Sequence, residues 1–193
     1  AFVSYEKIFQ DLIFAVDAKL RQILPPSDHV PAQLHEAMHY AVFTGGKRFR
    51  PVLTLSAAEA CGGRLSEALI PAAAIELIHA YSLVHDDLPA LDNDDFRRGK
   101  PTVDKKFGEA MGILAGDALL TQAFQALGEI KPAETALEIL TEISTAAGTY
   151  GMIGGQVSDL QSAGQELDLP LLDHINVHKT GKLIRCSAVC GAL

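Results

Sequence analysis

Apolar residues recur at intervals of three and four through the first part of the chain. Leu12, Val16 and Leu20 fall on one stripe, whereas Asp17 lies away from it. Because a helix repeats every 3.6 residues, this spacing predicts an amphipathic first helix that packs against a core. The two prolines at 25–26 should end that helix.

Proline and glycine positions mark the next boundaries. Pro31 suits the first turn of a second helix that should end at Gly45–Gly46, and Pro51 suits the first turn of a third that should reach Cys61. The same periodicity predicts further helices over residues 65–88, 110–128, 133–148, 150–162 and 171–192. Because no run alternates with a period of two and no linker or repeat divides the chain, we expect one all-helical domain over residues 1–193.

Composition agrees with a helical protein and argues against several other classes. Hydrophobic residues make up 48% of the 193 positions and aromatic residues only 6%, which disfavours an all-β fold. The net charge of -8 argues against a nucleic-acid-binding surface. The longest stretch without a formal charge, residues 143–158, falls short of the roughly 18 apolar residues that a membrane span needs. We therefore expect a soluble protein with no membrane span.

The N-terminal residues and the cysteines favour a cytoplasmic location. No basic region followed by an apolar run opens the chain, so no secretory signal is expected. The three cysteines are an odd number and fit a reducing compartment better than a disulfide framework. Cys186 and Cys190 lie four residues apart with no nearby ligand to complete a zinc site, so we interpret them as packing residues.

A dense acidic cluster is the clearest chemical signal in the sequence. The apolar segment 72–84 precedes it, so the cluster should lie at the end of a buried helix. Mg²⁺ binds through a few carboxylates while substrate phosphates complete its coordination shell, which makes it the favoured ligand. The alternative is a solvated acidic loop. The five carboxylates belong to Asp86, Asp87, Asp92, Asp94 and Asp95.

The spacing within the cluster requires a bend in the chain. Asp86 and Asp92 are six residues apart, roughly 240° around an ideal helix, so a straight helix would hold them apart. Proline in a helix removes a backbone hydrogen bond and clashes with the preceding turn. We therefore expect the chain to bend or end near Pro89 and to return Asp92 toward Asp86.

Basic residues lie where they suit a metal-bound polyphosphate. Lys47, Arg48 and Arg50 are placed at a helix N-terminus, where free amides and the helix dipole favour a phosphate. Arg97–Arg98 follow the acidic cluster and offer forked donors. His79, seven residues before Asp86, is a candidate for a second anion subsite. Taken singly, each group also fits an ordinary surface or core residue.

Two later segments carry weaker signals. Residues 151–159 are rich in glycine, with Gln156 and Asp159 three apart on one side of a helix. Close helix packing explains these glycines as well as ligand binding does. Lys179 and Thr180 add a cation and a hydroxyl.

Taken together, these motifs resemble the trans-type isoprenyl diphosphate synthases (polyprenyl synthetases), and most closely the bacterial farnesyl and geranyl diphosphate synthases. The resemblance implies an all-α, isoprenoid-synthase-type bundle around a central apolar cavity, with Mg²⁺ or Mn²⁺ as cofactor and a homodimeric, cytoplasmic enzyme. The family reaction condenses isopentenyl diphosphate with an allylic diphosphate, either dimethylallyl or geranyl diphosphate. The matching segments, in family order, are 45–51, 79–87, 92–102, 116–119, 154–156 and 178–181.

The resemblance also implies roles for individual residues. The metal ligands would be Asp86 and Asp92, with Asp87 alongside. Isopentenyl diphosphate would be bound by Lys47, Arg50, His79 and Arg98. The allylic diphosphate would be bound by Arg97, Lys179 and Thr180. The residues acting in catalysis would be Asp86, Asp87, Asp92, Arg97 and Lys179.

Product length depends on the residues that precede the acidic cluster. Tyr81 lies five residues before Asp86, and in farnesyl-producing relatives an aromatic residue there forms the cavity floor. Ser82 is small and would not block the growing chain. The resemblance therefore implies a C15 product, with C10 as the second candidate; an ordinary core tyrosine is the alternative interpretation of Tyr81.

The sequence departs from the family pattern in one respect. The family has a second aspartate-rich motif, and no such cluster occurs before Leu193, so the chain resembles an N-terminal portion of the domain that is inactive alone. One alternative is a truncated or degenerate relative that binds diphosphates or serves as a partner subunit. Another is a metal phosphohydrolase using His85 and Asp86, although the scattered set of ligands for that chemistry is not evident.

Overall fold

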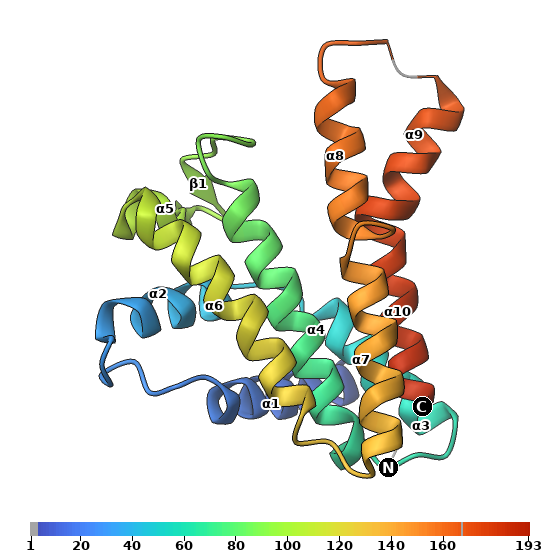
Figure 1. Cartoon of the computed structure of the whole chain (residues 1–193). Coiled ribbons are helices and arrows are strands. Elements are labelled where there is room, and N and C mark those ends of the chain that lie inside the picture. Colours follow the sequence, from blue (N-terminus) through green and yellow to red (C-terminus); the bar gives the residue numbers. More distant parts are fainter. Residues whose placement is uncertain (1–3, 167) are drawn as a thin grey trace.

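The computed structural model describes residues 4–166 and 168–193, and nearly all of its regular structure is helical (Figure 1). A π-helical segment, η1 (Asn176–Gly181), joins the last two helices, and the strands β1 (Phe96–Arg97) and β2 (Lys100–Pro101) pair antiparallel. The predicted all-α class is confirmed. The α-helices are α1 (Tyr5–Ile23), α2 (Ala32–Phe43), α3 (Phe49–Ala60), α4 (Leu65–Asp86), α5 (Val103–Phe107), α6 (Glu109–Leu127), α7 (Ala133–Ala147), α8 (Met152–Ser162), α9 (Leu169–Ile175) and α10 (Lys182–Ala192).

Helix α4 lies at the centre of the bundle and carries the acidic cluster at its C-terminal end. Residues 72–75, Leu77 and Ile78 are fully buried. The helix packs mainly against α6 and α3, and it also contacts α1, α2, α7 and α10. A helix that is apolar on all sides is stable only when other elements surround it, so this packing accounts for the composition of α4.

By length and composition α4 also qualifies as a candidate membrane span. The expectation from the sequence missed it, because only the longest stretch without a formal charge was considered. Its most apolar window has a mean hydropathy of 1.4, and 67% of that window is buried inside the protein. The sequence-based expectation overlooked this helix because its apolar residues are interrupted by Glu67 and Glu76. Its neighbours bury it as the core helix of the bundle.

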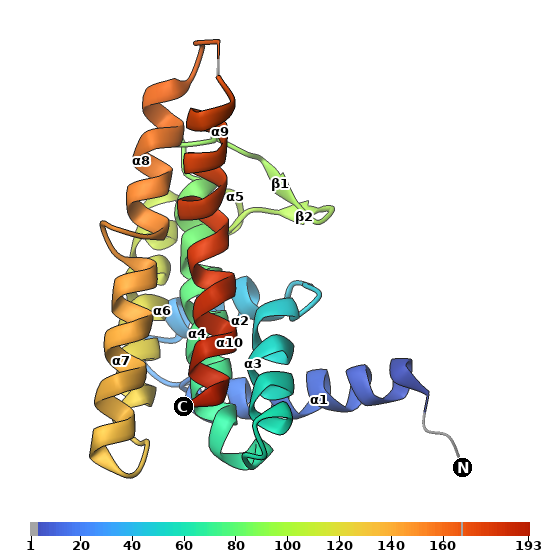
Figure 2. The same ribbon diagram turned by 90° about the vertical axis from the view of Figure 1, so that its right-hand side faces the viewer.

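The remaining helices surround α4 on several sides. α7, α8, η1 and α10 form a column beside it, and α1 crosses the bundle near its base (Figures 1 and 2). The predicted stripe of Leu12, Val16 and Leu20 is buried, which confirms how α1 packs. This arrangement leaves the C-terminal end of α4 facing α8 and η1, where the functional site lies.

One local prediction was wrong, and three short elements were missed. Residues 171–192 do not form one regular helix, because η1 interrupts it between α9 and α10. The β1–β2 hairpin and α5 were not predicted, since two-residue strands are too short to show an alternating pattern. Arg98 and Gly99, which join the strands, both have positive φ (54° and 75°), as a two-residue type I′ turn requires.

Candidate functional site

The acidic cluster folds back on itself at the end of α4. Asp86 is the last residue of that helix, and the backbone N–H of Asp92 donates to the carbonyl of Asp86 at 2.8 Å. Pro89 lies in the connecting loop, where it cannot continue the helix. The predicted return of the chain toward Asp86 is confirmed.

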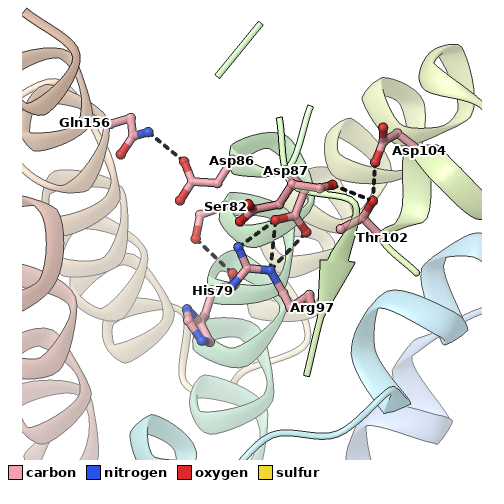
Figure 3. Close-up of polar contacts among 9 residues, drawn as sticks. His79, Ser82, Asp86, Asp87, Arg97, Thr102, Asp104 and Gln156 are labelled. Atoms are coloured by element: carbon pink, nitrogen blue, oxygen red, sulfur yellow. Dashed lines mark hydrogen bonds and ion pairs between the residues drawn. The ribbon is translucent and has the colours of Figure 1, made fainter. Parts of the chain in front are cut away.

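The two carboxylates assigned to a metal have few competing partners. Gln156 on α8 donates to Asp86 at 2.7 Å (Figure 3). Burial raises the pKa of Asp86, and the charges of Asp92 and Asp87 act in the same direction against the opposing influence of Lys179 and Arg97. Within the described residues neither Asp86 nor Asp92 forms an ion pair, so a divalent cation is the counter-charge that this donor set fits.

The described residues contain no group of three or more His, Cys, Asp or Glu side chains that could hold a metal ion. The metal phosphohydrolase alternative would need such a set. Mg²⁺ does not, because that ion is usually bound through one or two carboxylates while substrate phosphates complete its shell.

Asp87 differs from its neighbours, because it is committed to a protein partner. It is 3% exposed, and both its oxygens accept hydrogen bonds from Arg97, with distances of 2.6–3.0 Å (Figure 3). Forked pairs of this kind fix the orientation of a guanidinium group. Asp87 therefore orients Arg97, and its side chain is not free for a ligand.

A first cavity of about 540 Å³ collects the basic residues. All four residues assigned to isopentenyl diphosphate line it, and Glu76 lies in the same wall. Burial, and then the neighbouring arginines, lower the pKa of His79 to about 3, so the free protein holds this imidazole neutral. The four assigned residues are Lys47, Arg50, His79 and Arg98.

Arg48 does not act as the sequence suggested. It was grouped with the phosphate-facing cations, but it is 5% exposed and bonded to Asp17, Glu76 and the carbonyl of Val42. Its charge is thus neutralised inside the protein. Of the three cations in the 47–50 segment, Lys47 and Arg50 therefore remain available to a ligand in this cavity.

A second cavity of about 500 Å³ adjoins the first and is largely apolar. Arg50 and His79 line both cavities, so they stand at the junction. Asp86, Gln156, Lys179 and Thr180 are among its other polar residues. Its apolar wall includes Leu83, Leu91, Leu120, Met152, Ile153, Val157 and Leu160. The predicted central apolar cavity is therefore present.

Lys179 is positioned by α8. Its ammonium group donates to Asp159 at 2.7 Å. Burial lowers the pKa of Lys179, but the bond to Asp159 and the charge of Asp86 outweigh this and leave the pKa raised. Residues 176–181 form the π-helical segment, a conformation often found at functional sites.

The glycine-rich start of α8 serves close packing. A Cβ atom at Gly155 would lie 2.2 Å from the backbone nitrogen of Lys179. Of the two explanations that the sequence left open for these glycines, packing is the correct one at this position. Gln156 and Asp159, which the sequence did not assign to the site, reach it from the same helix, and their three-residue spacing was the signal.

We predict that Gly155→Ala destabilises the protein by about 1–3 kcal/mol or more, because backbone atoms cannot move aside as a flexible side chain can. Thermal unfolding measures this. Gly181→Ala is the matched control, since its Cβ would meet nothing closer than 3.6 Å and its φ is helical at -64°. Equal stability of the two variants would contradict the packing argument.

Comparison with known proteins identifies the family and the fold. Residues 31–193 match the polyprenyl synthetase family. The chain belongs to that family. Its relatives include the farnesyl diphosphate synthase of Geobacillus stearothermophilus, which is 46% identical over 197 residues, and that of Micrococcus luteus, which is 49% identical over 166 residues. The solved geranyltransferase structure from Legionella pneumophila superposes with a TM-score of 0.92 at 38% identity.

The matches cover different shares of this chain and of its relatives. The two matches to farnesyl diphosphate synthases cover 100% and 84% of this chain but 66% and 57% of the relatives. The match to the Legionella structure covers 96% of this chain and 67% of that one. The chain therefore spans roughly three fifths of the length of these curated relatives.

Proposed function

We propose that this protein condenses isopentenyl diphosphate with an allylic diphosphate, dimethylallyl or geranyl, to give a short prenyl diphosphate. The observation that carries the proposal is the pair of adjoining cavities. One is cationic and the other is largely apolar with the Asp86 carboxylate in its lining, and they share Arg50 and His79. The activity is that of the whole protein, to which residues 1–193 contribute both cavities as one helical domain.

The reaction needs charge stabilisation and a dry cavity more than a protein nucleophile. The C–O bond of the allylic diphosphate breaks, the double bond of isopentenyl diphosphate attacks the resulting cation, and a proton leaves as the new double bond forms. Arg97, Lys179 and Thr180 would hold the departing diphosphate, and Lys47, Arg50, His79 and Arg98 would orient isopentenyl diphosphate. The apolar wall excludes water, which would otherwise trap the cation.

Mg²⁺, with Mn²⁺ as a possible substitute, is the proposed cofactor, and Asp86 and Asp92 would hold it. When bound it would supply further electrostatic stabilisation of the leaving diphosphate. Asp87 would contribute by orienting Arg97. We also propose a homodimer in the cytoplasm, as the family resemblance implies, and light scattering of the purified protein tests the dimer.

For the product we propose farnesyl diphosphate, with geranyl diphosphate as the second candidate. Tyr81 and Ser82 both line the apolar cavity, and Tyr81 is the bulkier of the two. The comparisons lend no support to the alternative of a non-catalytic, diphosphate-binding relative.

We predict that the full-length protein forms a prenyl diphosphate from isopentenyl and geranyl diphosphates in the presence of Mg²⁺ and that chelation abolishes this activity. Radiolabelled isopentenyl diphosphate incorporated into extractable product measures it. Restoring Mg²⁺ after chelation is the control for irreversible inactivation. Full activity in excess chelator would contradict the metal-assisted mechanism, and no product under any condition would contradict the proposed function.

A further inference from the structure

A buried ion pair lies in the wall of the cationic cavity. Arg48 and Glu76 are each 5% exposed, and their side chains meet at 2.8 Å. Arg48 also donates at 2.8 Å to Asp17 on α1 and at 2.8 Å to the carbonyl of Val42 on α2. One guanidinium group therefore joins α1, α2 and α4 to the start of α3.

This guanidinium group belongs to a residue with an unfavourable backbone conformation. Arg48 has φ of 49°, in the left-handed region, at the residue that precedes α3. Such a conformation carries an energetic cost for a residue other than glycine and persists only when its surroundings hold it. The three hydrogen bonds of the Arg48 side chain supply that restraint.

The restraint determines where the two neighbouring cations point. Lys47 and Arg50 flank Arg48 in the sequence and line the cavity of about 540 Å³. The Nε atom of Arg50 is buried and has no hydrogen-bond partner within the described residues, so it is a donor available to an anion. A shift of Arg48 would move this donor.

Glu76 would be unexpected in an anion-binding cavity if net charge alone mattered. Its carboxylate lies in the same wall as Arg50 and His79, and its negative charge opposes the binding of a diphosphate. Its presence is explained if its hydrogen bond to Arg48 favours diphosphate binding, by fixing the geometry of the cavity, more than its negative charge disfavours that binding.

We propose that Arg48 and Glu76 are positioning residues for the isopentenyl diphosphate subsite, holding residues 45–50 so that Lys47 and Arg50 face the ligand. This inference rests on the proposed function for the identity of the substrate. The pair itself touches no substrate and acts through its neighbours.

The test replaces the pair without changing the net charge of the cavity. In the Arg48→Met/Glu76→Leu double variant one positive and one negative charge disappear together, and apolar replacement of a buried pair is often neutral for stability. We expect metal-free binding of inorganic pyrophosphate, measured by calorimetry in chelator, to weaken about tenfold or more, the effect of losing one charge-assisted hydrogen bond. Unchanged affinity in the folded variant would overturn the proposal.

Two further variants separate geometry from charge. Glu76→Gln keeps the hydrogen bond to Arg48 and removes the charge, so it should bind pyrophosphate at least as tightly as the unaltered protein; binding as weak as in the double variant would overturn the proposal. The matched control removes the surface pair Arg185–Glu142, in which the side chains meet at 2.6 Å, by Arg185→Met/Glu142→Leu. Affinity should stay unchanged there, and an equal loss would overturn a specific role for Arg48 and Glu76.

Kinetics distinguish this inference from the proposed function. In the double variant the KM for isopentenyl diphosphate should rise about tenfold, while the KM for the allylic substrate changes little. Equal increases in both would overturn the positioning role. Pyrophosphate binding needs no turnover, so it tests the positioning role of the pair even in a protein without prenyl transfer activity. Absence of transfer contradicts only the proposed function.

Discussion

Asp86→Ala is expected to lower kcat by about a thousandfold while the protein remains folded, since several kcal/mol of charge stabilisation would be lost with the metal. The fold should tolerate the change because burial and the neighbouring carboxylates already disfavour the Asp86 charge and raise its pKa. Removing it relieves repulsion with Asp92 and Asp87, at the cost of the attraction of Lys179 and Arg97 and of the hydrogen bond from Gln156. Steady-state kinetics at saturating Mg²⁺ and circular dichroism measure the two effects.

Asp11→Ala is the matched control for this variant. Its side chain is 69% exposed on α1, and within the described residues Lys7 is its one ion-pair partner, so neither activity nor stability should change appreciably. Undiminished turnover in Asp86→Ala would contradict the assigned metal site. A loss of structure in that variant would contradict the argument from repulsion.

Tyr81→Ala is expected to lengthen the product beyond C15. Tyr81 is 6% exposed, lines the apolar cavity and packs edge-on against His85 with ring centroids 5.7 Å apart, so its removal opens space where a prenyl tail would end. Burial, and to a lesser degree the charge of Asp86, raise its pKa to about 12, so the side chain is a neutral, bulky group. Chromatography of the prenyl alcohols after phosphatase treatment measures the product.

Tyr81→Phe is the control, because it keeps the ring and removes a buried hydroxyl that has no partner within the described residues. Its product should match that of the unaltered protein, and its stability should be equal or higher since no hydrogen bond is lost. A C15 product from Tyr81→Ala would show that the cavity floor lies elsewhere. A longer product from Tyr81→Phe would show that the hydroxyl, rather than the bulk of the ring, limits chain length.

Local patterns in the sequence were sufficient for the helices and for the bend in the acidic cluster. Helix α4 was predicted from its apolar run, and the return of Asp92 toward Asp86 followed from Pro89. Both depend on interactions between residues close in the sequence, which periodicity and proline stereochemistry describe directly. The motifs around Asp86 and Lys179 likewise indicate a diphosphate chemistry, because they combine carboxylates that suit Mg²⁺ with a cation that suits a phosphate.

Partner choice among charged residues could not be predicted in this way. Arg48 and Arg50 are two positions apart and have the same side chain, yet Arg48 is bonded to Asp17 and Glu76 and Arg50 lines the cavities. Asp86 and Asp87 are adjacent, yet Asp87 is bonded to Arg97 and Asp86 faces Gln156. These pairings join segments that only the packed bundle brings together. The same packing buries one charged group against an opposite charge and leaves its neighbour in the sequence available to a ligand. Local sequence therefore specified the helices and the chemical groups, whereas the assembly of α1, α4 and α8 around them assigned each group its partner.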